Sequence, residues 1–214
     1  MFNNITYDYL FNIDHSKYRE SGFKIEYSYK NVFDSLIDPI INIQNSVINK
    51  ITASKMVPNI LTTLGVISRT FSIYFLIWDD NRYKRYLSSL FFILGYYFDC
   101  SDGHYARKYD MCTNFGCFYD HFSDIVSTII LMIVCIFKKM FVSLFLFTLF
   151  SFFSINQLLV QEEIFSNYTP FFNFLKNNFE FLKVFDSLDF VKYFGMTSWV
   201  VLIGLSIIFE KSPS

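Results

Sequence analysis

The stretch that decides the fold is "LSSLFFILGYYFDCSDGHYARKYDMCTNFGCFYDHFSDIVSTIILMIVCIF", residues 87–137. Its two ends, residues 87–98 and 125–137, contain no charged side chain, whereas the segment between them carries several aspartates. An ionised aspartate near hydrocarbon costs about 2.5–3.5 kcal/mol on insertion scales. Acids beside such apolar runs therefore need a binding partner, and the identity of that partner bears on the function.

The composition indicates a membrane protein. The 214 residues are 53% hydrophobic and 17% charged, with a mean hydropathy of +0.32, whereas soluble domains average about 45–50% apolar and about 25% charged residues. The net charge of -1 predicts no nucleic-acid partner. The N-terminus lacks the pattern of a signal peptide, and the four cysteines do not form a disulfide framework.

Several apolar runs approach the length of about 20 residues that a helix needs to cross a bilayer. The predicted spans are residues 58–78, 86–105, 115–137, 140–160 and 194–210. The sequence thus predicts an all-α fold, a polytopic membrane bundle of about five to six transmembrane helices. Residues 166–194, in which a polar stripe faces many phenylalanines, are either an interfacial helix or a sixth, poorly apolar span.

An amphipathic helix is predicted to precede the first span. Apolar residues recur at helical spacing over residues 32–50, interrupted or kinked by Pro39, which is typical of a helix lying along the membrane interface. We therefore expect residues 1–56 to form a polar segment with this helix, and residues 57–214 to form the transmembrane domain. Lysines near the end of the helix favour the cytoplasm for the face that carries the aspartates.

The acidic residues occur at spacings that place them on single helix faces. If the second span continues as helix, the offsets of three, four and seven put four residues on one side: Asp99, Asp102, Gly103 and Ala106. After a short turn, residues spaced by four share a second face: Gly116, Asp120 and Asp124. Two such helices facing each other bring four carboxylates together at one membrane surface.

Divalent cations are the expected partner of these acids, because four carboxylates that close repel one another. Oxygen ligands suit Mg²⁺ or Mn²⁺, and two such ions about 4 Å apart can clamp a phosphoryl group. The small residues between the acids leave room for a ligand, and Arg107 can bind phosphate oxygens bidentately. A zinc site is the weaker alternative, because its candidate ligands match no usual paired spacing: His104, Cys112, Cys117 and His121.

Arg69 falls near the middle of the first predicted span. A long basic side chain there can snorkel toward the interface. Our hypothesis is that it faces the bundle instead, and pairs with a carboxylate of the acidic stretch or with a phosphate.

The acidic stretch resembles the signature of the CDP-alcohol phosphotransferase family, D-x2-D-G-x2-A-R-x8-G-x3-D-x3-D, and meets it at all eight positions: Asp99, Asp102, Gly103, Ala106, Arg107, Gly116, Asp120 and Asp124. Upstream, "VPNILTTLG" at residues 57–65 is similar to the start of that family's first core helix. The resemblance covers residues 57–137 well and the rest of the chain by hydropathy alone.

This resemblance implies an integral membrane transferase of phospholipid biosynthesis, which moves a phosphoalcohol group from a CDP-linked donor to an alcohol and releases CMP. One of the two substrates is a lipid, and such enzymes are commonly homodimers. Two Mg²⁺ or Mn²⁺ ions would be held by Asp99, Asp102, Asp120 and Asp124. Asp124 or His121 would be the base. Contacts with the CDP moiety would come from Asn59, Thr62, Gly103, Ala106, Arg107 and Gly116.

Within the family, three features favour the choline and ethanolamine branch. They are the amphipathic segment before the first span, Gly65 after the Pro-Asn pair, and "YDHFSD" at residues 119–124. "DGHYARK" and "CTNFG" instead look like phosphatidylinositol synthase, and the chain is shorter than typical aminoalcohol enzymes. Intramembrane prenyltransferases are disfavoured because their two acidic motifs lie far apart in sequence. A non-enzymatic scaffold is disfavoured because no signature residue is missing.

Overall fold

A computed structural model describes residues 32–78, 81–165, 176–178, 181, 183–184 and 195–210. No strand occurs in these ranges, which are almost entirely helical. The principal helices are α2 (Val32–Ile51), α3 (Val57–Trp78), α4 (Arg82–Lys108), α5 (Asn114–Phe137), α6 (Phe141–Phe165) and α9 (Met196–Phe209).

A helix lies at each of the five predicted spans, so the all-helical membrane bundle is confirmed. Three helical segments of the described chain are long and apolar enough to cross a membrane, namely Val57–Trp78, Asn114–Phe137 and Phe141–Val160. α9 is apolar but shorter, and α4 is long but polar at its ends. Most of the possible sixth span, residues 166–194, lies outside the described residues.

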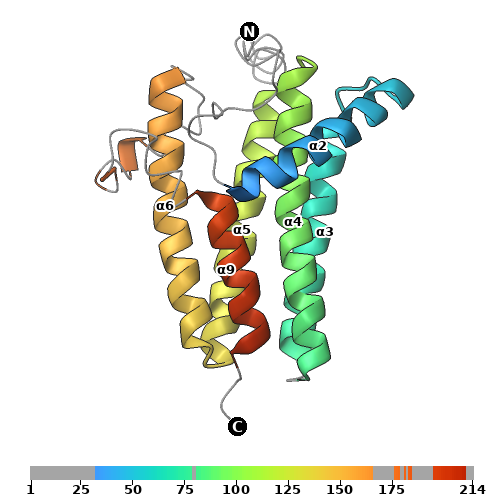
Figure 1. Ribbon diagram of the computed structural model, residues 1–214. Coiled ribbons are helices and arrows are strands. Elements are labelled where there is room, and N and C mark those ends of the chain that lie inside the picture. The colour runs from blue at the N-terminus through green and yellow to red at the C-terminus, as the bar shows by residue number, and fades with distance from the viewer. Residues whose placement is uncertain are drawn as a thin grey trace, which may run out of the picture.

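The bundle is built around α4, which packs along α3 on one side and against α9 on the other (Figure 1). α5 packs against α3 and α6, and α6 also packs against α9. The larger apolar core includes Leu76, Phe92, Leu131, Met140, Phe147 and Ile203. This core binds α3, α4, α5, α6 and α9 into one bundle, and the acidic stretch lies at the end where α4 meets α5.

The outer surface of α5 is apolar along its length. Exposed large side chains recur every three or four residues there: Phe118, Phe122, Ile125, Ile129 and Ile133. A helix that exposes such a stripe is suited to contact with lipid chains, because the lipid keeps the apolar side chains out of water. The exposed stripe therefore agrees with the membrane assignment made from hydropathy.

The helix predicted over residues 32–50 is present as α2 and continues through Pro39. It crosses the bundle obliquely rather than running parallel to α3 and α4 (Figure 1). Its outward face is apolar, with Leu36 63%, Ile43 67% and Ile51 79% exposed. The placement of this face at the membrane interface, the domain boundary after residue 56 and the cytoplasmic orientation stay predictions.

The inward face of α2 is held to α4 by amide side chains, a contact that was not predicted from the sequence. Asn45 is fully buried, and its Nδ2 donates to the Ser101 carbonyl at 2.8 Å and lies 2.9 Å from Nδ1 of His104. Gln44 donates to Ser101 Oγ at 3.1 Å, and Tyr105 donates to Asn49 Oδ1 at 3.0 Å. These bonds fix the half of α4 that carries the signature.

Candidate active site

A tight connection sets α5 beside α4. The Met111 amide donates to the Ala106 carbonyl at 2.7 Å, and Asp110 adopts a left-handed conformation with φ of 57°, which aspartate tolerates better than most residues. Thr113 then caps α5, because its hydroxyl accepts from the Gly116 amide at 2.9 Å. The predicted short turn is thus confirmed, and it places the start of α5 next to the end of α4.

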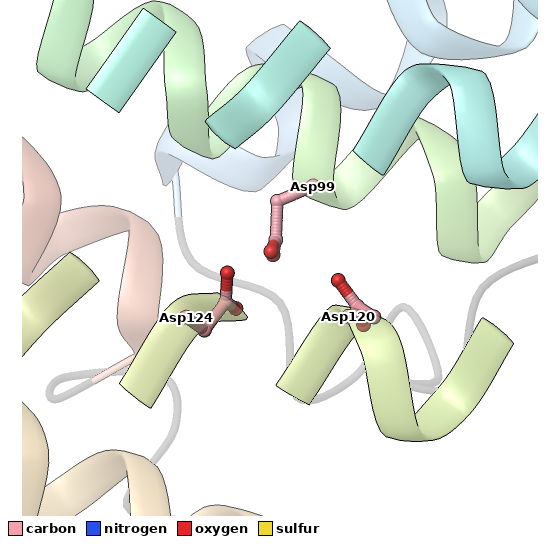
Figure 2. A group of neighbouring side chains, drawn as sticks. All are labelled: Asp99, Asp120 and Asp124. Atoms are coloured by element: carbon pink, nitrogen blue, oxygen red, sulfur yellow. The ribbon is translucent and has the colours of Figure 1, made fainter. Parts of the chain in front are cut away.

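Three aspartates meet across the gap between these helices. Figure 2 shows the carboxylate of Asp99, from α4, pointing toward those of Asp120 and Asp124, which come from the facing helix α5. One ligand oxygen from each lies within 4.8 Å of the others. These three residues are called the acid cluster below.

The acid cluster fits a divalent cation. The Oδ1 atoms of Asp99 and Asp120 are buried and accept no hydrogen bond within the described part of the chain. The Oδ1 atom of Asp124 is also buried, and its close partner is the guanidinium of Arg69. Buried carboxylate oxygens without donors are costly unless a cation is near. Oxygen ligands gathered from two helices are the donor set that Mg²⁺ and Mn²⁺ prefer.

Asp102, the fourth predicted acid, lies one helical turn further along α4 and has a different partner. It is 3% exposed, and its carboxylate accepts a hydrogen bond from the Thr62 hydroxyl of α3. All four acids therefore lie at the same end of the bundle, with three in the acid cluster and the fourth fixed against α3.

Arg69 faces the bundle interior and reaches the acid cluster from α3, as hypothesised. It is 8% exposed, and its Nη1 lies 2.5 Å from Oδ1 of Asp124 and 3.6 Å from Oδ1 of Asp99. A charge-assisted contact of this kind offsets the cost of burying both groups. The part of the hypothesis that pairs Arg69 with a site carboxylate is confirmed.

Glycines allow polar side chains to approach the helix backbone beside the acids. A Cβ on Gly103 would lie 2.8 Å from Nη1 of Arg107, so this guanidinium rests over the glycine. A Cβ on Gly116 would lie 3.2 Å from Oδ1 of Asn59, which brings the start of α3 to the start of α5. Ala106 is half-buried in the same turn of α4. The predicted nucleotide contacts from α3, α4 and α5 thus lie around one end of the bundle.

His121 neighbours the acid cluster, with its Nδ1 3.7 Å from Oδ2 of Asp120. The zinc alternative receives no support, because the acid cluster is the one group of three or more potential ligands found in the described residues. His104, one of its proposed ligands, instead contacts Asn45 of α2. None of the four cysteines, all of which lie within the described residues, forms a disulfide.

Comparison with known proteins identifies the family. The family model for CDP-alcohol phosphatidyltransferase matches residues 55–169, more than half of the chain. No curated protein and no solved structure matches the chain. The matched region runs from the start of α3 beyond the end of α6 and contains every member of the acid cluster. The chain therefore belongs to the CDP-alcohol phosphatidyltransferase family, a family of phospholipid-synthesis transferases that use divalent metal ions.

Proposed function

We propose that the chain transfers phosphocholine or phosphoethanolamine from its CDP-linked form to diacylglycerol, with release of CMP. The observation that carries this proposal is the acid cluster, in which two membrane helices bring three carboxylates within 4.8 Å of one another inside a region matched by the family model. Phosphoryl transfer needs cations that neutralise the negative charge of the substrate phosphates, and carboxylates gathered in this way would hold such cations.

The metal ligands proposed are Asp99, Asp102, Asp120 and Asp124, which would hold two Mg²⁺ or Mn²⁺ ions. When bound, these ions neutralise the donor diphosphate and the oxygen on which CMP leaves. Thr62 orients Asp102 through its hydrogen bond.

The nucleotide is held by groups around the acids. Arg107, resting over Gly103, binds phosphate oxygens as a fork of donors. Asn59 presents its amide beside Gly116, and Ala106 keeps the backbone of α4 accessible. Positioning of this kind lowers the barrier because the reacting groups meet already oriented.

The acceptor hydroxyl attacks the phosphorus that carries the aminoalcohol. A new phosphorus–oxygen bond forms, the bond from that phosphorus to the bridging oxygen of CMP breaks, and CMP leaves with that oxygen. The proton of the acceptor hydroxyl goes to the carboxylate of Asp124 or to the imidazole of His121, which stands beside Asp120.

The choline and ethanolamine branch is favoured by Gly65, by "YDHFSD" and by the amphipathic α2 before the first span. The second candidate uses CDP-diacylglycerol and a polar alcohol such as inositol, and it is favoured by "DGHYARK" and "CTNFG". A homodimer and an active site at the cytoplasmic face are further parts of the proposal.

The test is a donor and acceptor matrix in membranes that contain the protein. Labelled CDP-choline, CDP-ethanolamine and CDP-diacylglycerol are each offered with Mg²⁺ or Mn²⁺ and with diacylglycerol, inositol, serine or glycerol phosphate. The proposal predicts labelled phosphatidylcholine or phosphatidylethanolamine together with CMP. Incorporation of inositol but not of choline or ethanolamine would favour the second candidate. CMP release from none of the donors would favour a scaffold without activity.

A further inference from the structure

A buried arginine occupies the acid cluster from the side of α3. Arg69 is 8% exposed and lies on a helix that is long and apolar enough to span a membrane. The eight signature positions by which the sequence resembles the family do not include it. Its position in the bundle therefore calls for an explanation of its own.

The side chain of Arg69 packs against two glycines, Gly65 and Gly95, where α3 crosses α4. A Cβ on Gly95 would lie 2.7 Å from Cγ of Arg69 and 3.2 Å from the Gly65 carbonyl. A distance of 2.7 Å is too short for two carbon atoms, so the arginine stem fills the space that any larger residue at position 95 would take. The glycine thus directs the guanidinium inward, toward the acids.

The guanidinium shares its partners with the proposed metal ions. Its Nη1 contacts Asp124 and lies near Asp99, and Asp120 has a ligand oxygen within 4.8 Å of theirs. Its Nε and Nη2 atoms are buried and make no hydrogen bond within the described residues. When ionised, the acid cluster carries three negative charges and Arg69 one positive charge. A divalent ion entering the acid cluster therefore meets a cation already present.

We infer that Arg69 is a resident counter-cation of the acid cluster, which holds the three carboxylates together before metal binds and weakens their affinity for the metal. The inference rests on the proposed function, because it assumes that the acid cluster is a metal site. Arg69 is on this account a positioning residue, which acts on the reaction through the carboxylates. A guanidinium a few ångströms from a bound ion opposes it electrostatically, so removing the arginine should strengthen metal binding.

The experiment measures Mn²⁺ binding alone, without donor or acceptor. Purified protein in detergent is titrated with Mn²⁺, and the free ion is followed by its electron paramagnetic resonance signal. Arg69→Gln should bind Mn²⁺ at least about tenfold more tightly than the wild type, because a full charge is lost near the site. Arg69→Lys, which keeps the charge, should remain within about threefold of the wild type.

Arg85 provides a matched control. Arg85 lies in the first turn of α4 and is also buried, at 6% exposure, but it donates to the carbonyl of Glu210, which follows α9. Arg85→Gln should leave the Mn²⁺ affinity unchanged. Gly95→Ala supplies an independent variant if Arg69→Gln does not fold, because it displaces the arginine stem without removing the charge. It should also tighten Mn²⁺ binding.

The outcomes separate this inference from the proposed function. If the wild type binds Mn²⁺ and Arg69→Gln binds it no more tightly, the counter-cation role is wrong and the metal site stands. If the variant instead loses affinity for CMP while its Mn²⁺ affinity is unchanged, Arg69 serves a phosphate and the inference is overturned. If neither the wild type nor any variant binds Mn²⁺, both the inference and the metal site of the proposed function fail.

Discussion

At the residue scale, the signature aspartates differ in the side chains that surround them. Asp102 is fixed by the hydroxyl of Thr62, Asp124 is in contact with Arg69, and Asp120 has His121 beside it. Three acids of one sequence motif therefore have different neighbours, whereas Asp99 shares Arg69 with Asp124. Because the neighbours differ, a single substitution of a neighbour can change the orientation of one acid and leave its charge in place.

Thr62→Val is predicted to loosen Asp102. Valine keeps the shape of threonine but removes the hydroxyl that donates to the buried carboxylate. Leaving a buried acceptor without its donor costs about 1–3 kcal/mol, so the melting temperature should fall and CMP release should drop at least about tenfold. Thr62→Ser, which keeps the hydroxyl, should behave nearly as the wild type. Equal stability and activity of the valine variant would show that this bond is dispensable.

Gly103→Ala is predicted to weaken donor binding with little effect on folding. The added Cβ would lie 2.8 Å from Nη1 of Arg107, and this flexible end of the arginine can move away. The displaced guanidinium should raise KM for the CDP-linked donor about tenfold, a loss of about 1.4 kcal/mol. Gly204→Ala is a matched control. Gly204 lies on α9, away from the acids, and its added Cβ would also crowd a neighbouring side chain, with Ser89 Oγ at 3.0 Å. An unchanged KM in Gly103→Ala would contradict the phosphate role of Arg107.

The chemistry of the site could be predicted from residue spacing, because offsets of three, four and seven place acids on one helix face. The spacing could not predict which acids share the 4.8 Å group, since that depends on how α4 and α5 are rotated against each other. The packing of Arg69 against Gly95 could not be predicted either, because it depends on how α3 and α4 cross. Two segments far apart along the chain carry no local signal of such a crossing.

At the scale of elements, the helices can be predicted from hydropathy, because a helix that crosses a bilayer needs about 20 mostly apolar residues. The bounds of α3 and α5 agree with the predicted spans to within a residue. The polar attachment of α2 to α4 was not predicted, although its amides recur at helical spacing on the face opposite the apolar one: Asn42, Asn45 and Asn49. Attention to the polar face of α2 would have found this contact.

Asn45→Leu is predicted to release α2 from α4. The substitution removes the bonds from Asn45 to Ser101 and His104, and losing buried hydrogen bonds costs about 1–3 kcal/mol. Hydrogen exchange should then become faster in α2 and in the second half of α4. Lys50→Ala, at an exposed position of the same helix, should leave exchange unchanged. Undiminished protection in Asn45→Leu would mean that apolar contacts alone hold α2.

The whole molecule is built for a bilayer, with a polar site at one end of an apolar bundle. Exposed apolar side chains cover the outer faces of α3 and α5, among them Ile60, Ile67, Phe71, Phe122 and Ile129. We therefore expect the protein to stay in the membrane pellet during alkaline carbonate washing and to be extracted by mild detergent. Release by carbonate alone would contradict an integral membrane protein.

The central claim is that the acid cluster performs metal-dependent transfer from a CDP-linked donor, and CMP release by the purified protein tests it most directly. Wild type and Asp120→Asn are compared with CDP-choline or CDP-ethanolamine, diacylglycerol and Mg²⁺ or Mn²⁺. Asparagine keeps the size of aspartate and relieves repulsion among the carboxylates, so folding should survive. The account predicts CMP release by the wild type, its loss on chelation, and a fall of at least about a thousandfold in Asp120→Asn. A folded Asp120→Asn protein that releases CMP as fast as the wild type would contradict it.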